Sequence, residues 1–262
     1  MYIVWEGRYM GKMTAIIYYE FKMQIKRPVT WGILLAVTAL SLADNFPSAA
    51  NLARLEFLDQ PAYFVYRIMS FDALLLLFGL LFLLAGRFPM DRKNGMKSLL
   101  ISFPLKKWQY VRGKLIGGFF YTFCILCVFL TGSTMIYFIA APFKIHMADC
   151  VLPLLKVIVV SGIPSSLFVS FCSVAIPGLI DIRLFYILAA VLFGINASCV
   201  GSAEAMPFYL ITAGDLVRLV WMHPAWPFTN MESVLANGIF LLGGGLLPAG
   251  LLFLKRGFWR RK

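Results

Sequence analysis

Charged residues are scarce in this 262-residue chain. Aspartate, glutamate, lysine and arginine make up 14% of it, whereas about 25% is usual in soluble domains, and 61% of the residues are hydrophobic. A membrane-spanning helix needs roughly 20 mostly apolar residues, so six spans would occupy about half of the chain. Too little would remain for a separate catalytic domain. The composition excludes a soluble enzyme, a secreted disulfide scaffold and a transporter that carries its own ATP-hydrolysing domain.

Motifs for catalysis and metal binding are also missing. The chain has no G-x-x-x-x-G-K-[ST] phosphate loop and no H-E-x-x-H zinc motif. Its two histidines, His146 and His223, are far apart and fall between apolar runs. Cys124 and Cys127 have C-x-x-C spacing but lie within an apolar run, where they are expected to pack as small apolar residues and not as a redox pair. We therefore expect no enzymatic activity, no metal and no cofactor bound by this chain itself.

Six apolar runs are candidates for membrane spans. The run from Leu74 to Leu84 is apolar on every face, which is typical of a membrane helix and not of the alternating strands of a membrane barrel. The sequence predicts an all-α integral membrane protein, a six-helix transmembrane bundle formed by one domain over residues 1–262. The predicted spans are about 29–50, 68–86, 115–141, 157–180, 184–201 and 238–254.

The positions of the positive charges predict the orientation. With six spans, 19 of the 24 lysines and arginines fall on the side that holds both termini, and eight of the 12 acidic residues fall on the other. By the positive-inside rule, both termini are predicted to be cytoplasmic. We expect a multi-pass protein of the plasma (inner) membrane. Basic residues that flank spans do not make the folded basic patch of a nucleic-acid-binding protein, so we expect no nucleic acid as a partner.

Ionisable residues are rare within the predicted spans. Asp72, Lys156 and Asp181 are the candidates, and each lies near the end of a span, where its charge can reach headgroups or water. Asn196 is the deepest polar side chain, which we expect to hydrogen-bond between helices. An ion-coupled carrier usually needs a buried carboxylate, and the sequence does not clearly supply one.

An amphipathic pattern covers residues 12–27, ahead of the first predicted span. Pro28 ends this segment, so the pattern predicts a helix in the cytoplasmic interface, which either anchors the chain or also contacts a soluble partner. Residues 1–11 lack the apolar core of a secretory signal, so no cleaved leader is expected. At 100° per residue, the predicted stripe consists of Thr14, Ile17, Tyr18, Phe21 and Ile25, opposite Lys12, Lys22 and Lys26.

The predicted cytoplasmic loop at residues 91–114 combines basic and apolar residues. A connector between antiparallel spans needs only a few polar residues. This loop also carries an apolar group, and Pro104 would end a short helix there. Exposed apolar residues in a basic loop need lipid or protein to cover them. The apolar group consists of Met96, Leu99, Leu100 and Phe103.

In this loop the chain resembles the permease subunits of ABC transporters of the ABC-2 type. Such permeases leave their second span with an acidic, basic and glycine stretch, then a leucine- or threonine-rich helix, a small residue and proline, and a stretch ending in Gly-Lys. Asp91 stands where glutamate is usual and Met96 where threonine is commoner, and neither change alters the charge or the apolar character much. The matching residues are Asp91, Arg92, Gly95, Leu99, Leu100, Pro104, Gly113 and Lys114.

The resemblance implies a coupling helix, roughly residues 95–103, that docks in a cleft of a separate ATP-hydrolysing subunit. Its anchors would be Leu99, Leu100 and Phe103, with Arg92 and Lys97 near the rim. ATP and magnesium would then belong to that partner. The complete assembly would hold two ATPase subunits and a second permease chain, identical or paralogous, in the lipid bilayer.

The outer segment at residues 202–237 is too apolar for a solvated loop and too rich in proline for a span. Two short half-membrane helices satisfy both facts if other protein covers their backbone, and an aromatic belt at the interface is the alternative. ABC-2 permeases have a re-entrant helical pair at this place, so the resemblance favours an outer gate. Its candidate residues are Pro207, Phe208, Trp221, Pro224, Trp226 and Pro227.

These features lead to one main functional prediction, the transmembrane permease subunit of an ABC exporter. Its weakly charged, aromatic-rich spans suggest an amphipathic or hydrophobic cargo, such as a peptide, a drug or a lipid. Two alternatives are a membrane scaffold or immunity-type factor without transport, and an ion-coupled carrier.

Overall fold

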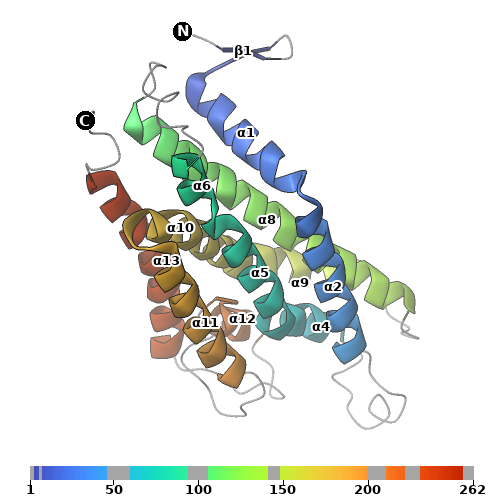
Figure 1. The fold of residues 1–262 in the computed structure, drawn as a ribbon. Helices are drawn as coiled ribbons and strands as arrows, with labels where there is room; N and C mark the ends of the chain where they lie inside the picture. The colour runs from blue at the N-terminus through green and yellow to red at the C-terminus, as the bar shows by residue number, and fades with distance from the viewer. Residues whose placement is uncertain are drawn as a thin grey trace.

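The computed structural model describes residues 3–5, 8–45, 60–93, 106–140, 148–199, 211–221 and 231–255. These residues form a helical bundle with one antiparallel pair of short strands near the N-terminus (Figure 1). The strands are β1 (Ile3–Trp5) and β2 (Arg8–Met10). The helices are α1 (Lys12–Ile25), α2 (Pro28–Asn45), α4 (Pro61–Arg67), η2 (Ile68–Asp72), α5 (Ala73–Ala85), α6 (Arg87–Lys93), α8 (Lys107–Ala140), α9 (Ala148–Val157), η3 (Ile158–Gly162), α10 (Ile163–Leu179), α11 (Ile182–Cys199), α12 (Gly214–Trp221) and α13 (Met231–Leu254).

Within the described ranges, four helical segments are long and apolar enough to cross a membrane, which agrees with a membrane-embedded protein. They are Ala62–Asp91, Lys107–Ile139, Ala148–Leu179 and Met231–Leu254, and they contain most of four predicted spans. A fifth arises if α1 and α2, which meet at an angle of 60°, form one broken span. The remaining predicted span, 184–201, corresponds to α11, a shorter apolar helix. The helical fold is thus confirmed, and the count of six spans stays a prediction.

Prolines mark the breaks in these helices. Pro28 occupies the first position of α2, where its missing N–H breaks no helical hydrogen bond, and Pro61 starts α4 in the same way. Pro164 follows η3, a five-residue π-helix. Because proline cannot donate to the carbonyl four residues earlier, a widened turn just before it is expected.

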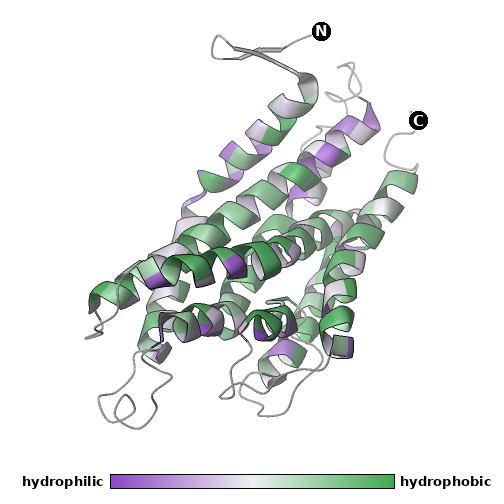
Figure 2. Ribbon diagram, turned by 180° about the vertical axis from the view of Figure 1, so that it is seen from behind, coloured by the Kyte–Doolittle hydropathy of each residue, from purple (hydrophilic) through white to green (hydrophobic). Residues whose placement is uncertain are grey.

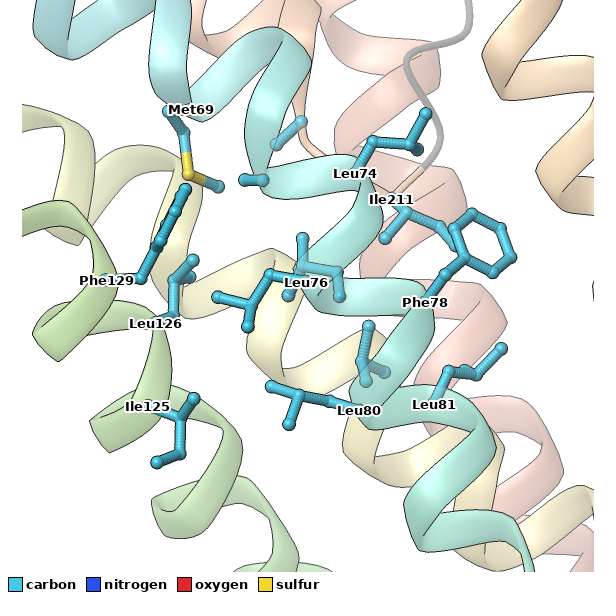
Figure 3. Packing of buried hydrophobic residues seen from close by; sticks show 14 of the residues in the cluster. Met69, Leu74, Leu76, Phe78, Leu80, Leu81, Ile125, Leu126, Phe129 and Ile211 are labelled. Atoms are coloured by element: carbon cyan, nitrogen blue, oxygen red, sulfur yellow. The ribbon is translucent and has the colours of Figure 1, made fainter. Parts of the chain in front are cut away.

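The centre of the bundle is formed by α5, which is covered on nearly all sides. Figure 3 shows Leu76 and Leu80 of α5 pointing toward Leu126 and Phe129 of α8. These four side chains are completely buried. The described parts of α2, α5, α8, α10 and α12 share this core, which also receives residues from η2 and η3.

The outer faces of the bundle are apolar as well. Leu35, Ile139, Ile187 and Ile239 have at least 62% of their surface exposed, and most of the ribbon is coloured hydrophobic in Figure 2. Apolar exposure on this scale needs lipid to cover it. The first turns of α1 and α8, the helix α6 and the last turn of α13 all lie at one end of the bundle (Figure 1).

Candidate functional site

A group of charged side chains joins the two flanks of the predicted coupling loop. The loop residues 94–105 lie outside the described part, between α6 and α8. Asp91 of α6 and Lys114 of α8 form an ion pair, with 2.6 Å between Oδ2 and Nζ. The hydroxyl of Tyr110, one turn before Lys114, donates a hydrogen bond to the same Oδ2 at 2.5 Å. The two helices that flank residues 94–105 are therefore fastened to each other.

Helix α1 joins the same group through Glu20. Its Oε1 lies 2.6 Å from Lys114 Nζ, and its Oε2 lies 3.7 Å from Arg87 of α6. The Lys114 side chain is only 2% exposed and contacts two carboxylates from different helices. We call Glu20, Arg87, Asp91, Tyr110 and Lys114 the charge network. Its two cations balance its two anions, as buried charges require.

Two glycines of α8 allow α1 to approach closely enough for these contacts. A Cβ atom at Gly113 would lie 2.5 Å from Ile16 Cγ2, and one at Gly117 would lie 3.0 Å from the Ile17 carbonyl oxygen. Neither space could hold a larger residue without moving α1. The Gly113-Lys114 pair that carries the resemblance thus has two structural uses: the glycine admits α1, and the lysine binds Glu20 of that helix.

The surface of α1 has three faces, one more than the sequence pattern indicates. Of the predicted apolar stripe, Ile17 and Phe21 are half-buried and Tyr18 is exposed. Glu20 and Gln24, which lie beside the stripe, are buried, and Glu20 contacts Lys114 of α8. On the third face Lys22 is half-buried, with Nζ 5.3 Å from the Tyr18 ring centre, and Lys26 is exposed.

Further hydrogen bonds hold the bend between α1 and α2 against α8. The Thr30 hydroxyl donates to the Gln24 carbonyl oxygen at 3.2 Å and is 2.8 Å from the Tyr121 hydroxyl. Trp31 Nε1 donates to the Ile25 carbonyl oxygen at 2.9 Å. The broken pair of helices is therefore fixed at its corner.

The first turn of α8 also binds the end of α13. Lys107 Nζ donates to the carbonyl oxygens of Phe253 and Lys255, each at 2.6 Å. Lys255 Nζ donates in turn to the carbonyl oxygens of Gly178 and Leu179, each at 3.0 Å, at the end of α10. A lysine at a helix C-terminus satisfies free carbonyl groups and complements the helix dipole. The loop flank is thereby connected to α10 and α13.

The predicted coupling residues are only partly within the described chain. Asp91 belongs to the charge network, and Arg92 lies in α6. The others fall outside the described residues: Gly95, Met96, Lys97, Leu99, Leu100, Phe103 and Pro104.

The outer segment contains a short buried helix, α12. Of the predicted gate residues, Trp221 ends this helix. Its ring centroid lies 4.9 Å from the ring centroid of Tyr66 and 6.1 Å from that of Tyr63, both in α4. The indole thus packs against the bundle. The remaining gate residues lie outside the described part of the chain: Pro207, Phe208, Pro224, Trp226 and Pro227.

An acidic and a basic side chain are buried together in α12. Asp215 Oδ1 is 3.9 Å from Arg218 NH1, and the two side chains are 0% and 1% exposed. Burial raises the pKa of Asp215 to about 6, although the charge of Arg218 acts in the opposite direction. Sequence reasoning missed this pair. The available signal was the i, i+3 spacing of opposite charges within an otherwise apolar stretch.

Two of the three ionisable residues expected near the span ends are surface groups. Lys156 and Asp181 are exposed, and Asp181 Oδ1 accepts a hydrogen bond from the Arg183 backbone N–H at 2.8 Å. Asp72, at the end of η2, is half-buried. Asn196 is buried, and its amide donates to the Leu192 carbonyl oxygen of its own helix at 3.0 Å.

No cluster of three or more His, Cys, Asp or Glu side chains suited to a metal occurs among the described residues. Cys124 and Cys127 are half-buried free thiols. Comparisons with models of protein families, with curated proteins and with solved structures found no match for this chain.

Proposed function

We propose that this chain is the transmembrane permease subunit of an ABC exporter, coupled to a separate ATPase. The observation that carries the proposal is the charge network, which fastens both flanks of the 94–105 loop to each other and to α1. A loop that is moved by a partner transmits force only if its flanks are stiff. Breaking a buried ion pair costs about 3–5 kcal/mol, so the flanks resist separation.

The network leads from the loop into the rest of the bundle. Helix α6 continues into α5 at the centre of the core, and the 34 residues of α8 extend for about 50 Å, well beyond the roughly 30 Å of hydrocarbon. Lys107 joins α13 to α8 through its hydrogen bond to the Phe253 carbonyl oxygen. Movement of the loop would then shift α5, α8 and α13 together as a rigid body, a common mode of switching.

The partners follow from the same arrangement. The apolar residues of the 94–105 loop would dock in the ATPase, with two ATPase subunits below two permease chains, identical or paralogous. ATP and magnesium would be bound by the ATPase. The loop flanks, the start of α1 and the end of α13 share one end of the bundle, which supports placing both termini in the cytoplasm of a cell with this protein in its plasma membrane (Figure 1). The cargo would be amphipathic or hydrophobic.

The proposal is tested by combining Leu99→Asp with Phe103→Asp. Two charges in the docking face should abolish docking, because each would be buried without a partner. The chain would be purified in mild detergent from its native host, and the ATP hydrolysis that accompanies it would be measured. Wild type should bring ATPase activity with it, and the double variant should insert normally but lose the activity.

The matched control is Leu99→Met combined with Phe103→Leu, which keeps the face apolar and should retain the ATPase. If wild type carries no ATPase activity, or if the charged variant keeps it, the proposal is wrong.

An ion-coupled carrier is a second candidate, and one observation favours it: the complete burial of Asp215. Transport by such a carrier would follow an imposed ion gradient without ATP. An exporter driven by an ATPase would require ATP and continue when the gradient is removed. Vesicles that contain the chain, with and without ATP and with and without a pH gradient, separate the two.

A further inference from the structure

Helix α12 is enclosed by other helices over most of its surface. It packs against α4, α9, α13 and both π-helices, η2 and η3. Residues 211–215 are buried, and so are Val217 and Arg218. A helix of eight residues in such surroundings is a packed part of the bundle, and its polar groups are removed from water.

The Asp215 carboxyl lacks the partners that an ionised carboxylate needs. In the part of the chain that the structure describes, neither of its oxygens accepts a hydrogen bond. The nearest cationic atom, Arg218 NH1, is 3.9 Å away, beyond hydrogen-bond distance. An ionised carboxylate without donors is unfavourable in a buried site, whereas a neutral carboxylic acid is tolerated much better.

No charged group on the neighbouring helices replaces the missing donors among the described residues. Arg67 of α4 is directed to Asp44, at 3.4 Å, and to the Tyr63 hydroxyl. Lys156 of α9 is exposed. The acidic groups on these elements offer no hydrogen-bond donor when they are ionised, and they are Asp72 of η2, Asp149 of α9 and Glu232 of α13.

The two π-helices that pack against α12 each carry a buried serine hydroxyl. Ser70 of η2 and Ser161 of η3 are fully buried, and their Oγ atoms have no hydrogen-bond partner in the described part of the chain. A serine hydroxyl oxygen can accept a hydrogen bond from the O–H of a protonated carboxyl group. Buried polar atoms without partners require an explanation, and π-helices are frequent at functional sites.

We propose that Asp215 is a proton-binding site, which holds a proton while α12 is packed in the bundle and releases it when α12 becomes exposed to water. The step is a simple acid dissociation: the carboxyl O–H bond breaks, the electron pair stays on the carboxylate and the proton goes to water. Neither ATP nor a second substrate takes part. The site goes beyond the proposed permease function and stands on the surroundings of α12 alone.

The direction of the pH effect follows from the proton affinity of the two states. The pKa of Asp215 is raised from 3.8 to about 6 in the packed state, and exposure to water would return it toward 3.8. The packed state therefore binds the proton more tightly, so acid favours packing and a rise in pH favours exposure. The packing equilibrium should shift on the order of 100-fold between pH values below the lower and above the higher pKa.

The bound proton can be detected by infrared spectroscopy on the full chain in lipid. Difference spectra between about pH 4 and about pH 8, two units on either side of the Asp215 pKa, should show loss of the C=O stretch of a protonated carboxylic acid. Asp215→Asn should lack this component. Asp149→Asn, which changes an exposed carboxyl group near the same bundle, should retain it. A component that persists in Asp215→Asn would overturn the assignment.

Exposure of α12 is measured separately by thiol labelling. The five native cysteines are first changed to alanine. In that chain, the labelling rate of Leu216→Cys reports the exposure of α12, and the labelling rate of Met231→Cys, at an exposed position, gives the effect of pH on thiol reactivity itself. The labelling ratio of the two sites should rise with pH, by up to about 100-fold. Adding Asp215→Asn, a neutral side chain of nearly the same shape, should make the ratio independent of pH. A ratio that is constant in the parent chain, or equally pH-dependent with Asn, contradicts the proposal.

Discussion

Lys114 is a single cation shared by carboxylates from two different helices. Its Nζ lies 2.6 Å from Glu20 Oε1 and 2.6 Å from Asp91 Oδ2, whereas Arg87 reaches Glu20 only at 3.7 Å. Without Lys114 the two carboxylates would repel each other at close range in a mostly dry environment. One side chain therefore links α1, α6 and α8 at this end of the bundle.

Lys114→Met should lower the stability of the purified protein by about 3 kcal/mol, because it removes the cation that two buried carboxylates share. Thermal unfolding in detergent measures the change. The triple variant that adds Glu20→Gln and Asp91→Asn should regain most of the lost stability, because it has no carboxylates left at these two positions. Lys26→Met removes an exposed lysine and should change stability by less than about 0.5 kcal/mol. A Lys114 variant as stable as the Lys26 control would contradict the role given to the network.

Asp215 should make the protein less stable as the pH rises. Its pKa in the packed state, about 6, exceeds the ordinary value of 3.8. Its contribution to the free energy of unfolding is therefore full below about pH 4 and is lost as the pH rises through 6. Asp215→Asn removes this dependence. Unfolding midpoints should agree for the two proteins near pH 4, and near pH 8 the variant should be more stable by about 2–3 kcal/mol. Equal midpoints near pH 8 would refute the expectation.

Residues paired over long sequence distances could not be predicted from the chain. Glu20 binds Lys114, 94 positions away, and a helical wheel of α1 shows Glu20 only as a polar residue beside an apolar stripe. Asp91 and Lys114 could be selected from the sequence because the loop motif contains both, although the motif gives no sign that they touch.

The contact between α1 and α8 depends on how closely two helix backbones approach. It is extensive and includes the glycines at positions 113 and 117 of α8. A helix interior normally disfavours glycine by about 1 kcal/mol relative to alanine. Here the small residue brings Glu20 within reach of Lys114, so packing outweighs propensity.

Gly117→Ala should destabilise the protein despite the better helix propensity of alanine. Its Cβ would meet Glu20 Cβ at 2.8 Å and the Ile17 carbonyl oxygen at 3.0 Å, which forces α1 away from α8 at a cost of about 1–3 kcal/mol. Gly132→Ala in the same helix has no atom within 4 Å of the new Cβ and should gain up to about 1 kcal/mol. Thermal unfolding of the pair tests this: stabilisation by both changes would show that α1 does not press on Gly117.

Most of the long helices were predictable from apolar runs, but their ends were not. The predicted span at 115–141 begins after Lys114, whereas α8 begins at Lys107. A search for apolar runs stops at a lysine because it has no information on Glu20 and Asp91, which neutralise that lysine. The predicted run 68–86 likewise stops at Arg67 and Arg87, whereas the helical segment continues past both, over residues 62–91. These arginines have acidic partners, Asp44 and Glu20, which a search for apolar runs does not see.

For the whole molecule, the proposed function predicts that binding of the ATPase and use of its energy are separable. Asp91→Asn changes none of the proposed docking residues at 95–103 but weakens the bond between the loop flanks. The variant should retain the ATPase and move about tenfold less cargo per ATP hydrolysed, since a hydrogen bond to a charged group contributes about 1.5–3 kcal/mol. Transport and ATP turnover in vesicles give this ratio, and an unchanged ratio would show that the network does not carry the coupling.

The contact between Lys107 and the end of α13 also sets an order of events during synthesis. The carbonyl groups that Lys107 binds belong to Phe253 and Lys255, nearly 150 residues later in the chain. Helices α1, α6 and α8 can assemble their charges as soon as α8 has been inserted. The flank of the loop is complete only when the last helix is in place, so a truncated or stalled chain lacks this final contact.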